Sequence, residues 1–451
     1  MVSQMIKDTS DIQDMCITSY DAYSEVCSKL ARLCPRLVPR PLWGLSLARV
    51  ARMAPQAALA VCDSCLETVE EIHRFWMTLD RNGKCGVCGE AGNEIDEDWL
   101  YCLLDKDGNL VGHKGVVILT LEKARQYKGI AYLRSLRLLC EKCHLAKHQG
   151  YAEVHGREQE ALEHLARINQ LNLEETRKLV DKAFSIHHQL SKIYDWTIKI
   201  GELKGLDEEL RKRVEELLNT MYKKGFCLYG GWLYYHYPKY YEEVEPRIIH
   251  ETIAILTEAS KKSGTTTVAD NKWVDSLLGI VKEELESRGI RVLSREFKLF
   301  IKYLLENEEH KRSLQRMVDY IVAGKANRHI SVTPLLWNYV DLTGKWMVFV
   351  PTSLYPRIFR YMLGALEEAK LAYSAKITSR REDHSSREEL PIIIYVPISL
   401  AIHYVAEVAE VMRSVLKEFH VRKKMFFKSD LFTEKGVYSG SASHKSYIYV
   451  Y

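Results

Sequence analysis

Two pairs of cysteines constrain this chain of 451 residues more than any other feature. Cys85 and Cys88 lie in GKCGVCGEAG, and Cys140 and Cys143 lie in RLLCEKCHLAKHQG. A Cys-x-x-Cys turn can present two thiolates to one ion, and two such turns supply the four ligands of a tetrahedral zinc site. The spacing therefore predicts a structural Zn²⁺ ion bound by all four sulfur atoms.

The two pairs are separated by 51 residues, far more than in a compact zinc finger. Closing a longer loop costs only logarithmically more free energy, so the gap is compatible with one shared ion. A further close pair, Cys62 and Cys65, has no second pair to match it. We expect these two residues to be small buried side chains rather than metal ligands.

The composition is that of an ordinary globular protein, with 47% hydrophobic and 27% charged residues. No apolar run has the length that a bilayer requires, and the N-terminus lacks a secretory pattern. We therefore expect a cytoplasmic protein without a membrane partner. In a reducing compartment, an odd number of cysteines whose regular spacing is Cys-x-x-Cys favours metal binding over disulfides.

Changes in sequence texture predict a multidomain α+β protein with four parts. The first is helical, the second holds the cysteine pairs and the helices after them, the third is a helical middle domain, and the last alternates strands and helices. These parts span residues 1–80, 81–215, 216–335 and 336–451.

The last part contains two β-branched runs, KWMVFVP and PIIIYVPI, that are typical of buried strands. Helical segments follow each of them, and KKMFFKSD and KSYIYVY read as further strands. Residues 331–451 also carry 16 Lys and Arg against 12 Asp and Glu, which accounts for the whole net charge of +4. This surplus would suit a phosphate-bearing partner, although such a surplus is also common by chance.

His144 and His148 follow the second cysteine pair at a spacing of four residues. On a helix they share one face, where they could hold a second, catalytic metal ion or contact a phosphate. The plainer alternative is that His144 supports the cysteine turn and that His148 is solvated. Spacing alone leaves both readings open.

The segment from Pro41 to Trp196 resembles a prokaryotic family of HNH-type zinc proteins. The resemblance rests on PLWG, on CxxCG, on LCxxCHxxKHxGxA and on a later helix with HLxxxN. The matching residues are Pro41, Leu42, Trp43, Gly44, Cys85, Cys88, Gly89, Leu139, Cys140, Cys143, His144, Lys147, His148, Gly150, Ala152, His164, Leu165, Asn169 and Trp196. The resemblance implies a treble-clef or HNH-like zinc module with a ββα-metal site that acts on phosphodiesters.

The family has its general-base histidine in a His-Glu-x-Trp element, which here reads Asp96-Glu97-Asp98-Trp99. Asp96 thus stands in place of the histidine, and a carboxylate is a weak base near neutral pH unless its pKa is raised. Ser135 lies near the expected asparagine, and His113 is a candidate replacement for the missing imidazole. The resemblance then implies a nucleic-acid-binding module with altered catalysis, with Mg²⁺ or Mn²⁺ as the candidate catalytic ion.

Residues 340–451 resemble a second family, named after a basophilic-leukaemia-expressed protein, which has a phosphothreonine-lyase domain. The matching residues are Trp346, Phe349, Pro351, Ala375, Lys376, Tyr395, Lys428, Asp430, Thr433, Gly436 and Tyr438. The resemblance implies an α/β domain with a curved, mostly antiparallel sheet backed by helices, as in cap-binding translation factors.

By this resemblance Lys376 would be the base of a phosphothreonine lyase, and Arg380, Arg381 and Lys428 would bind phosphate. Phe349 stands where the lyase has its acid histidine. The alternative is that these cations are solvated or bind nucleic-acid phosphates without catalysis. The aromatic segment LYGGWLYYHYPKYYEE could stack bases, but such density is more often a packing seam.

Three functions therefore stay open. The first is a zinc-containing protein that binds DNA or RNA through an HNH-like module joined to a phosphate-binding domain, with His144, His148 and Asp96 at its site. The second is a phosphothreonine lyase that acts on a phosphoprotein through Lys376. The third is a non-catalytic scaffold that binds RNA or a ribonucleoprotein.

Overall fold

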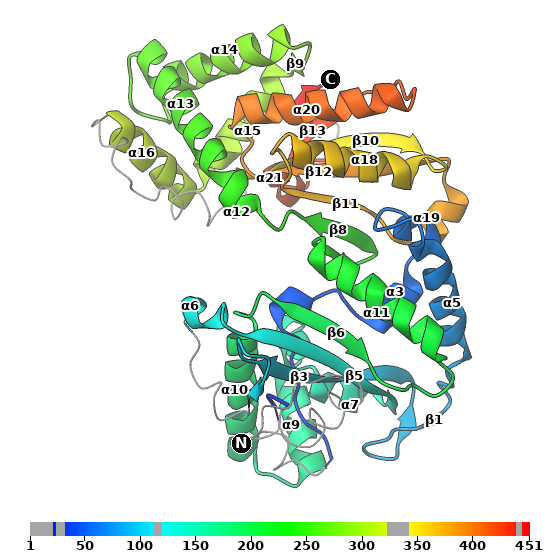
Figure 1. Cartoon of the computed structure of the whole chain (residues 1–451). Coiled ribbons are helices and arrows are strands. Elements are labelled where there is room, and N and C mark those ends of the chain that lie inside the picture. The colour runs from blue at the N-terminus through cyan, green and yellow to red at the C-terminus, as the bar shows by residue number, and fades with distance from the viewer. Residues whose placement is uncertain (1–20, 24–31, 112–119, 323–341, 439–443) are drawn as a thin grey trace. The chain divides into compact units, whose positions relative to one another are not determined.

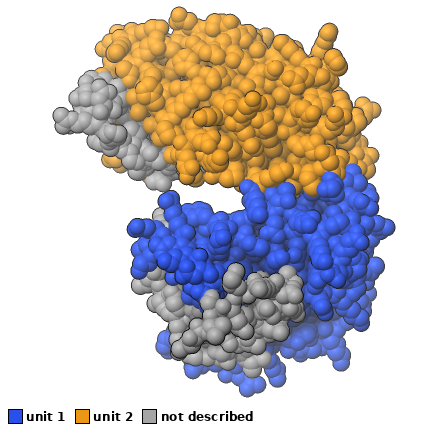
Figure 2. Space-filling model, in the orientation of Figure 1, with its two compact units in different colours: residues 1–55, 64–223 blue, residues 56–63, 224–451 orange. Residues whose placement is uncertain are grey.

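The computed structural model describes residues 21–23, 32–111, 120–322, 342–438 and 444–451. It divides into two compact units (Figure 2), each of which is considered separately. Unit 1 comprises residues 1–55 and 64–223, and unit 2 comprises residues 56–63 and 224–451. No helix within the described ranges is both long and apolar enough to span a bilayer.

Unit 1 is organised around a four-stranded sheet in the order β4–β3–β5–β6 (Figure 1). The long strands β3 (Glu94–Leu104) and β5 (Lys128–Leu139) are antiparallel, and β6 (Trp196–Ile200) runs parallel to β5. Gly129 allows the Trp196 ring to lie against β5, because a Cβ there would fall 2.3 Å from that ring. The remaining strands of unit 1 are β1 (Gly83–Lys84), β2 (Ala91–Gly92) and β4 (Leu110–Val111).

Helices cover this sheet and carry the chain between its strands. Asn172 caps α10 by a reciprocal capping box with Glu175, and Ser46 caps α3 by accepting from Arg49 N. The helices of unit 1 are η2 (Arg40–Leu42), α3 (Leu47–Arg52), α5 (Cys65–Thr78), α6 (Leu121–Ala124), α7 (Glu141–Lys147), α8 (Gln149–Val154), α9 (Glu158–Asn169), α10 (Leu173–Leu190) and α11 (Glu208–Lys223). A short helix, α4 (Pro55–Ala58), begins at the last residue before the sequence passes to unit 2.

Unit 2 contains an eight-stranded sheet in the order β7–β8–β11–β12–β10–β13–β14–β9, in which every pair is antiparallel. Helices α18 and α20 pack on one face, where Trp346 donates to the carbonyl of Val405 on α20 at 3.0 Å (Figure 1). The strands are β7 (Phe226–Tyr229), β8 (Trp232–His236), β9 (Arg291–Val292), β10 (Gly344–Pro351), β11 (Ser374–Thr378), β12 (Glu389–Val396), β13 (Phe426–Ser429) and β14 (Tyr449–Val450).

The helices of unit 2 include a group between β8 and β10 and the segments that link the later strands. Helices α13 and α14 pack on each other and on α20. The helices are α12 (Tyr240–Glu243), α13 (Glu245–Ser263), α14 (Asn271–Ser287), α15 (Ser294–Glu306), α16 (Glu308–Val322), α18 (Tyr355–Glu368), α19 (Arg381–Ser386), α20 (Ile402–Glu418) and α21 (Asp430–Glu434).

The mixed α+β class expected from the sequence is confirmed. Strands β7, β8 and β9 come from the segment read as a helical middle domain, and they pair with strands from residues after 336. The expected boundary between residues 335 and 336 lies outside the described residues, and the eight-stranded sheet takes strands from both sides of it. The physical reason is the β7–β8 hairpin, whose turn residues Gly230 and Gly231 have φ angles of 57° and 79°.

Candidate metal centre and neighbouring polar cluster

The first cysteine pair lies in a tight turn between the paired strands β1 and β2. Cys85 N donates to Glu90 O at 2.7 Å, and Gly89 N donates to Cys85 O at 2.9 Å. Gly89 has a φ of 79°, which a side chain would strain. Gly89 thus lets the chain turn back directly after Cys88, so that Cys85 and Cys88 lie in the same turn.

The second pair lies where β5 ends and α7 begins. Cys140 is the N-cap of α7, and its sulfur accepts from Cys143 N at 3.5 Å. Helix N-caps commonly use a side-chain acceptor in this way. The helix therefore turns the Cys143 sulfur toward Cys140.

The 51-residue insert brings its own ends together because it folds back as a long antiparallel pair. Glu94 at the start of β3 lies opposite Leu139 at the end of β5. Gly86 N donates to Leu138 O at 2.8 Å, which fixes the first cysteine turn to β5. The pairing of β3 with β5 therefore brings the two cysteine turns together across the 51-residue insert.

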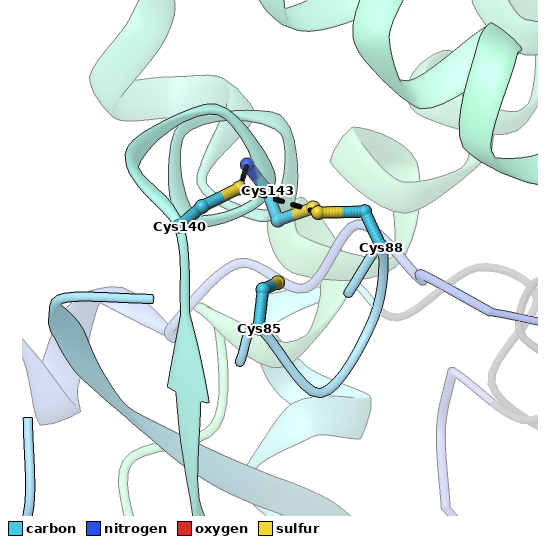
Figure 3. A group of neighbouring side chains, drawn as sticks. All are labelled: Cys85, Cys88, Cys140 and Cys143. Carbon is cyan, nitrogen blue, oxygen red and sulfur yellow. Dashed lines mark hydrogen bonds between the residues drawn. The ribbon is translucent and has the colours of Figure 1, made fainter. Parts of the chain in front are cut away.

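All four sulfur atoms face one another (Figure 3) and lie within 4.8 Å of each other. Cys88 Sγ and Cys140 Sγ are 3.6 Å apart. Four ligands at a Zn–S distance of about 2.3 Å in a tetrahedron would be roughly 3.8 Å apart. The group Cys85, Cys88, Cys140 and Cys143 could thus hold one metal ion, and its geometry is compatible with zinc.

The surroundings of the cysteine sulfur atoms change their pKa values in opposite directions. Burial acts to raise the pKa of Cys85, but nearby backbone N–H groups outweigh it and lower that pKa to about 7. Burial, together with the neighbouring sulfur atoms, raises the pKa of Cys143 above its usual range. Four thiolates at these distances need a compensating positive charge, which a bound cation would supply.

A histidine and an arginine on α9 support the group from behind. Arg167 Nη2 lies 2.9 Å from His164 Nδ1, and His164 Nε2 lies 3.1 Å from Cys143 Sγ. A guanidinium can only donate, so Nδ1 accepts and Nε2 carries the ring proton toward the sulfur. Such a partner orients a metal ligand and accepts part of its charge.

Asn169 on the same helix fixes a distant part of unit 1. Its side chain accepts from Leu33 N at 3.1 Å and donates to Leu33 O at 2.8 Å. Leu33 is buried against the cysteine group. The histidine and asparagine of the HLxxxN segment therefore both stabilise the surroundings of the metal centre.

The acidic residues at the start of β3 alternate between the two faces of the strand. Glu97 accepts from Leu47 N at 3.2 Å and Ala48 N at 2.7 Å, so it binds the N-terminus of α3. It also accepts from Trp99 Nε1 at 2.8 Å. Burial raises the pKa of Glu97. Glu97 therefore has a structural role at α3.

Asp96 points to the other face, where it pairs with Lys147 at the end of α7. Lys147 Nζ donates to both carboxylate oxygens, at 2.8 and 2.6 Å, and to Glu97 O at 2.8 Å. All three ammonium protons thus have acceptors. Burial acts to raise the pKa of Asp96, but Lys147 and His148 outweigh it and hold that pKa well below its usual range. Asp96 is therefore ionised at neutral pH, and a carboxylate with so low a pKa is a weak proton acceptor.

The structure brings Asp96, His144 and His148 together. One ligand atom from each lies within 4.8 Å of the others. His148 Nε2 is 3.3 Å from Asp96 Oδ1, and the two imidazole rings are 4.7 Å apart at 73°. Burial lowers the pKa of His144 to about 4, so its ring is neutral at neutral pH. A neutral imidazole can accept a proton or bind a metal ion.

Two arginines of β5 lie beside this group. Arg137 reaches Asp96 at 3.3 Å and Asp98 at 3.5 Å, and Arg134 Nε donates to Asp98 at 2.9 Å. Their side chains are 31% and 39% exposed, whereas the two aspartates are buried. These guanidinium groups are therefore within reach of a ligand in solvent. Sequence reasoning did not select them, because only the register of β3 with β5 places them there.

The remaining residues considered from the sequence lie away from these two groups or outside the described residues. Ser135 faces Asp98 across the β3–β5 pair, and His113 lies outside the described residues. Cys65 is buried and Cys62 is partly buried, and each is disulfide-bonded, so neither sulfur is available as a metal ligand.

In unit 2, Lys376 lies on β11 with its Nζ 4.7 Å from the centre of the Trp232 ring. Arg380 lies against the β7–β8 turn, where a Cβ on Gly231 would fall 2.3 Å from its Nε, and Arg381 begins α19. Lys428 is buried, donates to Val437 O at 2.9 Å, and lies under the Tyr438 ring. The four residues proposed from the resemblance thus have different surroundings.

Comparison with known proteins adds no relative to these observations. None of the family models matches this chain, and no curated protein matches it significantly.

Proposed function

We propose that unit 1 is a zinc-stabilised nucleic-acid-binding module of the HNH-endonuclease type. The observation that carries the proposal is the grouping of Asp96, His144 and His148 within 4.8 Å of one another. These residues come from a strand and from the end of a helix that begins in the cysteine group. The arrangement supports contact with the phosphodiester of DNA or RNA.

The donor set of this group also suits a divalent cation. Two imidazoles and one carboxylate match the preferences of Mn²⁺ or Zn²⁺ better than those of Mg²⁺, which prefers oxygen ligands. A cation bound there would stabilise negative charge that develops on a phosphate. His144 supplies a neutral ring nitrogen without first losing a proton.

The residues of the chain divide the remaining work among them. Asp96 stays ionised and orients His148, which leaves the other nitrogen of that ring as the better candidate proton acceptor. Arg134 and Arg137 offer partly exposed guanidinium groups for phosphate oxygens. Asp96 is therefore a positioning residue in this proposal, and strand cleavage depends on the histidines.

The test uses the full-length protein with supercoiled plasmid and with single-stranded RNA, in Mn²⁺ or Mg²⁺. We expect binding of both, and nicking that is faster in Mn²⁺ and falls by about 100-fold or more in His148→Ala. His144→Ala should lose the Mn²⁺ preference. His155→Ala is the matched control, because His155 is exposed on the loop after α8. A wild-type protein that binds neither nucleic acid would overturn the proposal.

A further inference from the structure

The sheet of unit 2 has two faces of opposite character. Alternation along β10 and β12 places Trp346, Val348, Ile392 and Ile394 on the face that α18 and α20 cover, and all four are buried. The side chains between them point to the other face. That second face is polar, aromatic and partly exposed.

Strand register gathers cations and rings on this second face. Lys376 on β11 lies opposite Tyr234 on β8, and Lys345 on β10 lies opposite both Tyr395 on β12 and Lys428 on β13. We call this surface the lysine face and define it by residues Trp232, Tyr234, Lys345, Phe349, Lys376, Tyr395 and Lys428. It extends over five adjacent strands.

Lys376 occupies the centre of a group of three rings. Its Nζ is 4.7 Å from the centre of the Trp232 ring, 5.2 Å from that of Tyr234 and 5.4 Å from that of Tyr395. Within the described residues, no carboxylate lies at ion-pair distance from this ammonium. Rings hold a cation in place but do not neutralise it.

The lysine face has an excess of positive charge. Lys345 pairs with Asp430, which also accepts from Thr343 at 2.5 Å, and Lys428 is buried under Tyr438. Burial and the nearby Lys345 charge lower the pKa of Lys376 to about 8, because both destabilise the charged ammonium. A bound anion would stabilise the charged ammonium and so offset both effects.

The rings distinguish between possible anionic partners. Phe349 on β10 is 45% exposed, and Trp232, Tyr234 and Tyr395 are partly exposed on neighbouring strands. Proteins that bind single strands combine lysines along the backbone with aromatic rings that stack bases, often on a sheet. A phosphorylated peptide is more often bound by clustered arginines, and the cations of this face are lysines.

We propose that the lysine face binds a segment of single-stranded nucleic acid, with phosphates against Lys376 and Lys345 and bases against the exposed rings. The inference extends the proposed nucleic-acid function to unit 2 and rests on it for the choice of partner. Lys428 supports the surface from below, because its ammonium is already bonded to Val437 O.

The test measures binding of a fluorescent 12-nucleotide RNA and of the equivalent DNA to the full-length protein by anisotropy. Lys376→Gln should weaken binding by about tenfold, and the slope of log K against log salt should flatten by about 0.7, as for one lost phosphate contact with a single strand. Lys376→Arg should retain most of the affinity. Lys272→Gln, at an exposed site on α14, is the control and should change nothing.

Two further arms separate this inference from the function proposed for unit 1. The loss of oligonucleotide affinity caused by Lys376→Gln should also appear in a protein that carries His144→Ala and His148→Ala. It should appear even if unit 1 shows no nicking activity. Equal binding by wild type and Lys376→Gln would overturn the inference. Elimination of phosphate from a phosphothreonine peptide that depends on Lys376, without oligonucleotide binding, would also overturn it in favour of a lyase.

Discussion

Lys147 places its buried ammonium 2.8 and 2.6 Å from the two carboxylate oxygens of Asp96. The lysine comes from the end of α7 and the aspartate from the start of β3, so the pair joins the two elements that carry the candidate site. It also keeps the carboxylate charged. Asp96 is therefore better suited to orient His148 than to take a proton from water.

Removing one member of this pair should be much worse than removing both. Lys147→Met removes the closest cation from a buried carboxylate, leaves Arg137 and His148 at 3.3 Å, and should lower the free energy of unfolding by about 3 kcal/mol. The double variant Lys147→Met, Asp96→Leu should recover much of that loss. Urea unfolding at neutral pH measures both, and a single variant as stable as wild type would show that the pair is not formed.

His164 should control metal affinity without being a ligand. His164→Ala removes the N–H partner of Cys143 Sγ, and loss of such a partner typically weakens metal binding by about 10–100-fold. Competition with a chromophoric zinc chelator measures this change. His155→Ala serves as the control, and an unchanged affinity in His164→Ala would contradict the assigned orientation.

Lys376 should react as an unusually neutral amine. Its pKa of about 8 lies below the ordinary lysine value, because burial and Lys345 disfavour the charged form. The fraction of free amine at Lys376 should therefore rise through pH 8, whereas an ordinary exposed lysine becomes free only about two pH units higher. Acetylation followed over pH by mass spectrometry gives both midpoints. Lys345→Gln should move the Lys376 midpoint upward, and a midpoint above 10 in the wild type would contradict the burial of this amine.

The same pKa shift has a consequence for stability. A lysine whose pKa is lower in the folded than in the unfolded state makes folding more favourable as the pH rises from 8 toward 10.5. Lys376→Gln should remove that rise. Thermal melting of wild type and variant between pH 7 and 10 compares the two slopes, after correction with Lys272→Gln.

Some of these features can be predicted from the sequence. The Cys-x-x-Cys spacing and the i, i+4 histidines depend on local geometry, and the structure places the four cysteines together and the histidines beside Asp96. Strands β10 and β12 also lie where the β-branched runs occur, and β13 lies within KKMFFKSD, as expected. For these features, the residue types and their spacing along the chain were enough for the prediction.

Other features depend on strand register and could not be predicted. The Lys147–Asp96 pair requires a helix end to meet a strand 51 residues earlier, and the rings around Lys376 come from β8 and β12, the two strands that flank β11. The β7–β8 hairpin had a local signal, since LYGGWLYYH alternates around Gly-Gly. We read that segment as an aromatic cluster in a helical region, and its pairing with β11 became visible only in the sheet.

The central claim is that the sulfur atoms of Cys85, Cys88, Cys140 and Cys143 share one ion. Elemental analysis of the full-length protein, purified without chelators or added metal, tests it most directly. We predict one zinc per chain in the wild type. Cys143→Ser should lose this zinc, and unit 1 should then no longer unfold in one cooperative transition. A folded wild-type protein that contains no stoichiometric metal, and whose stability a chelator leaves unchanged, would contradict the account.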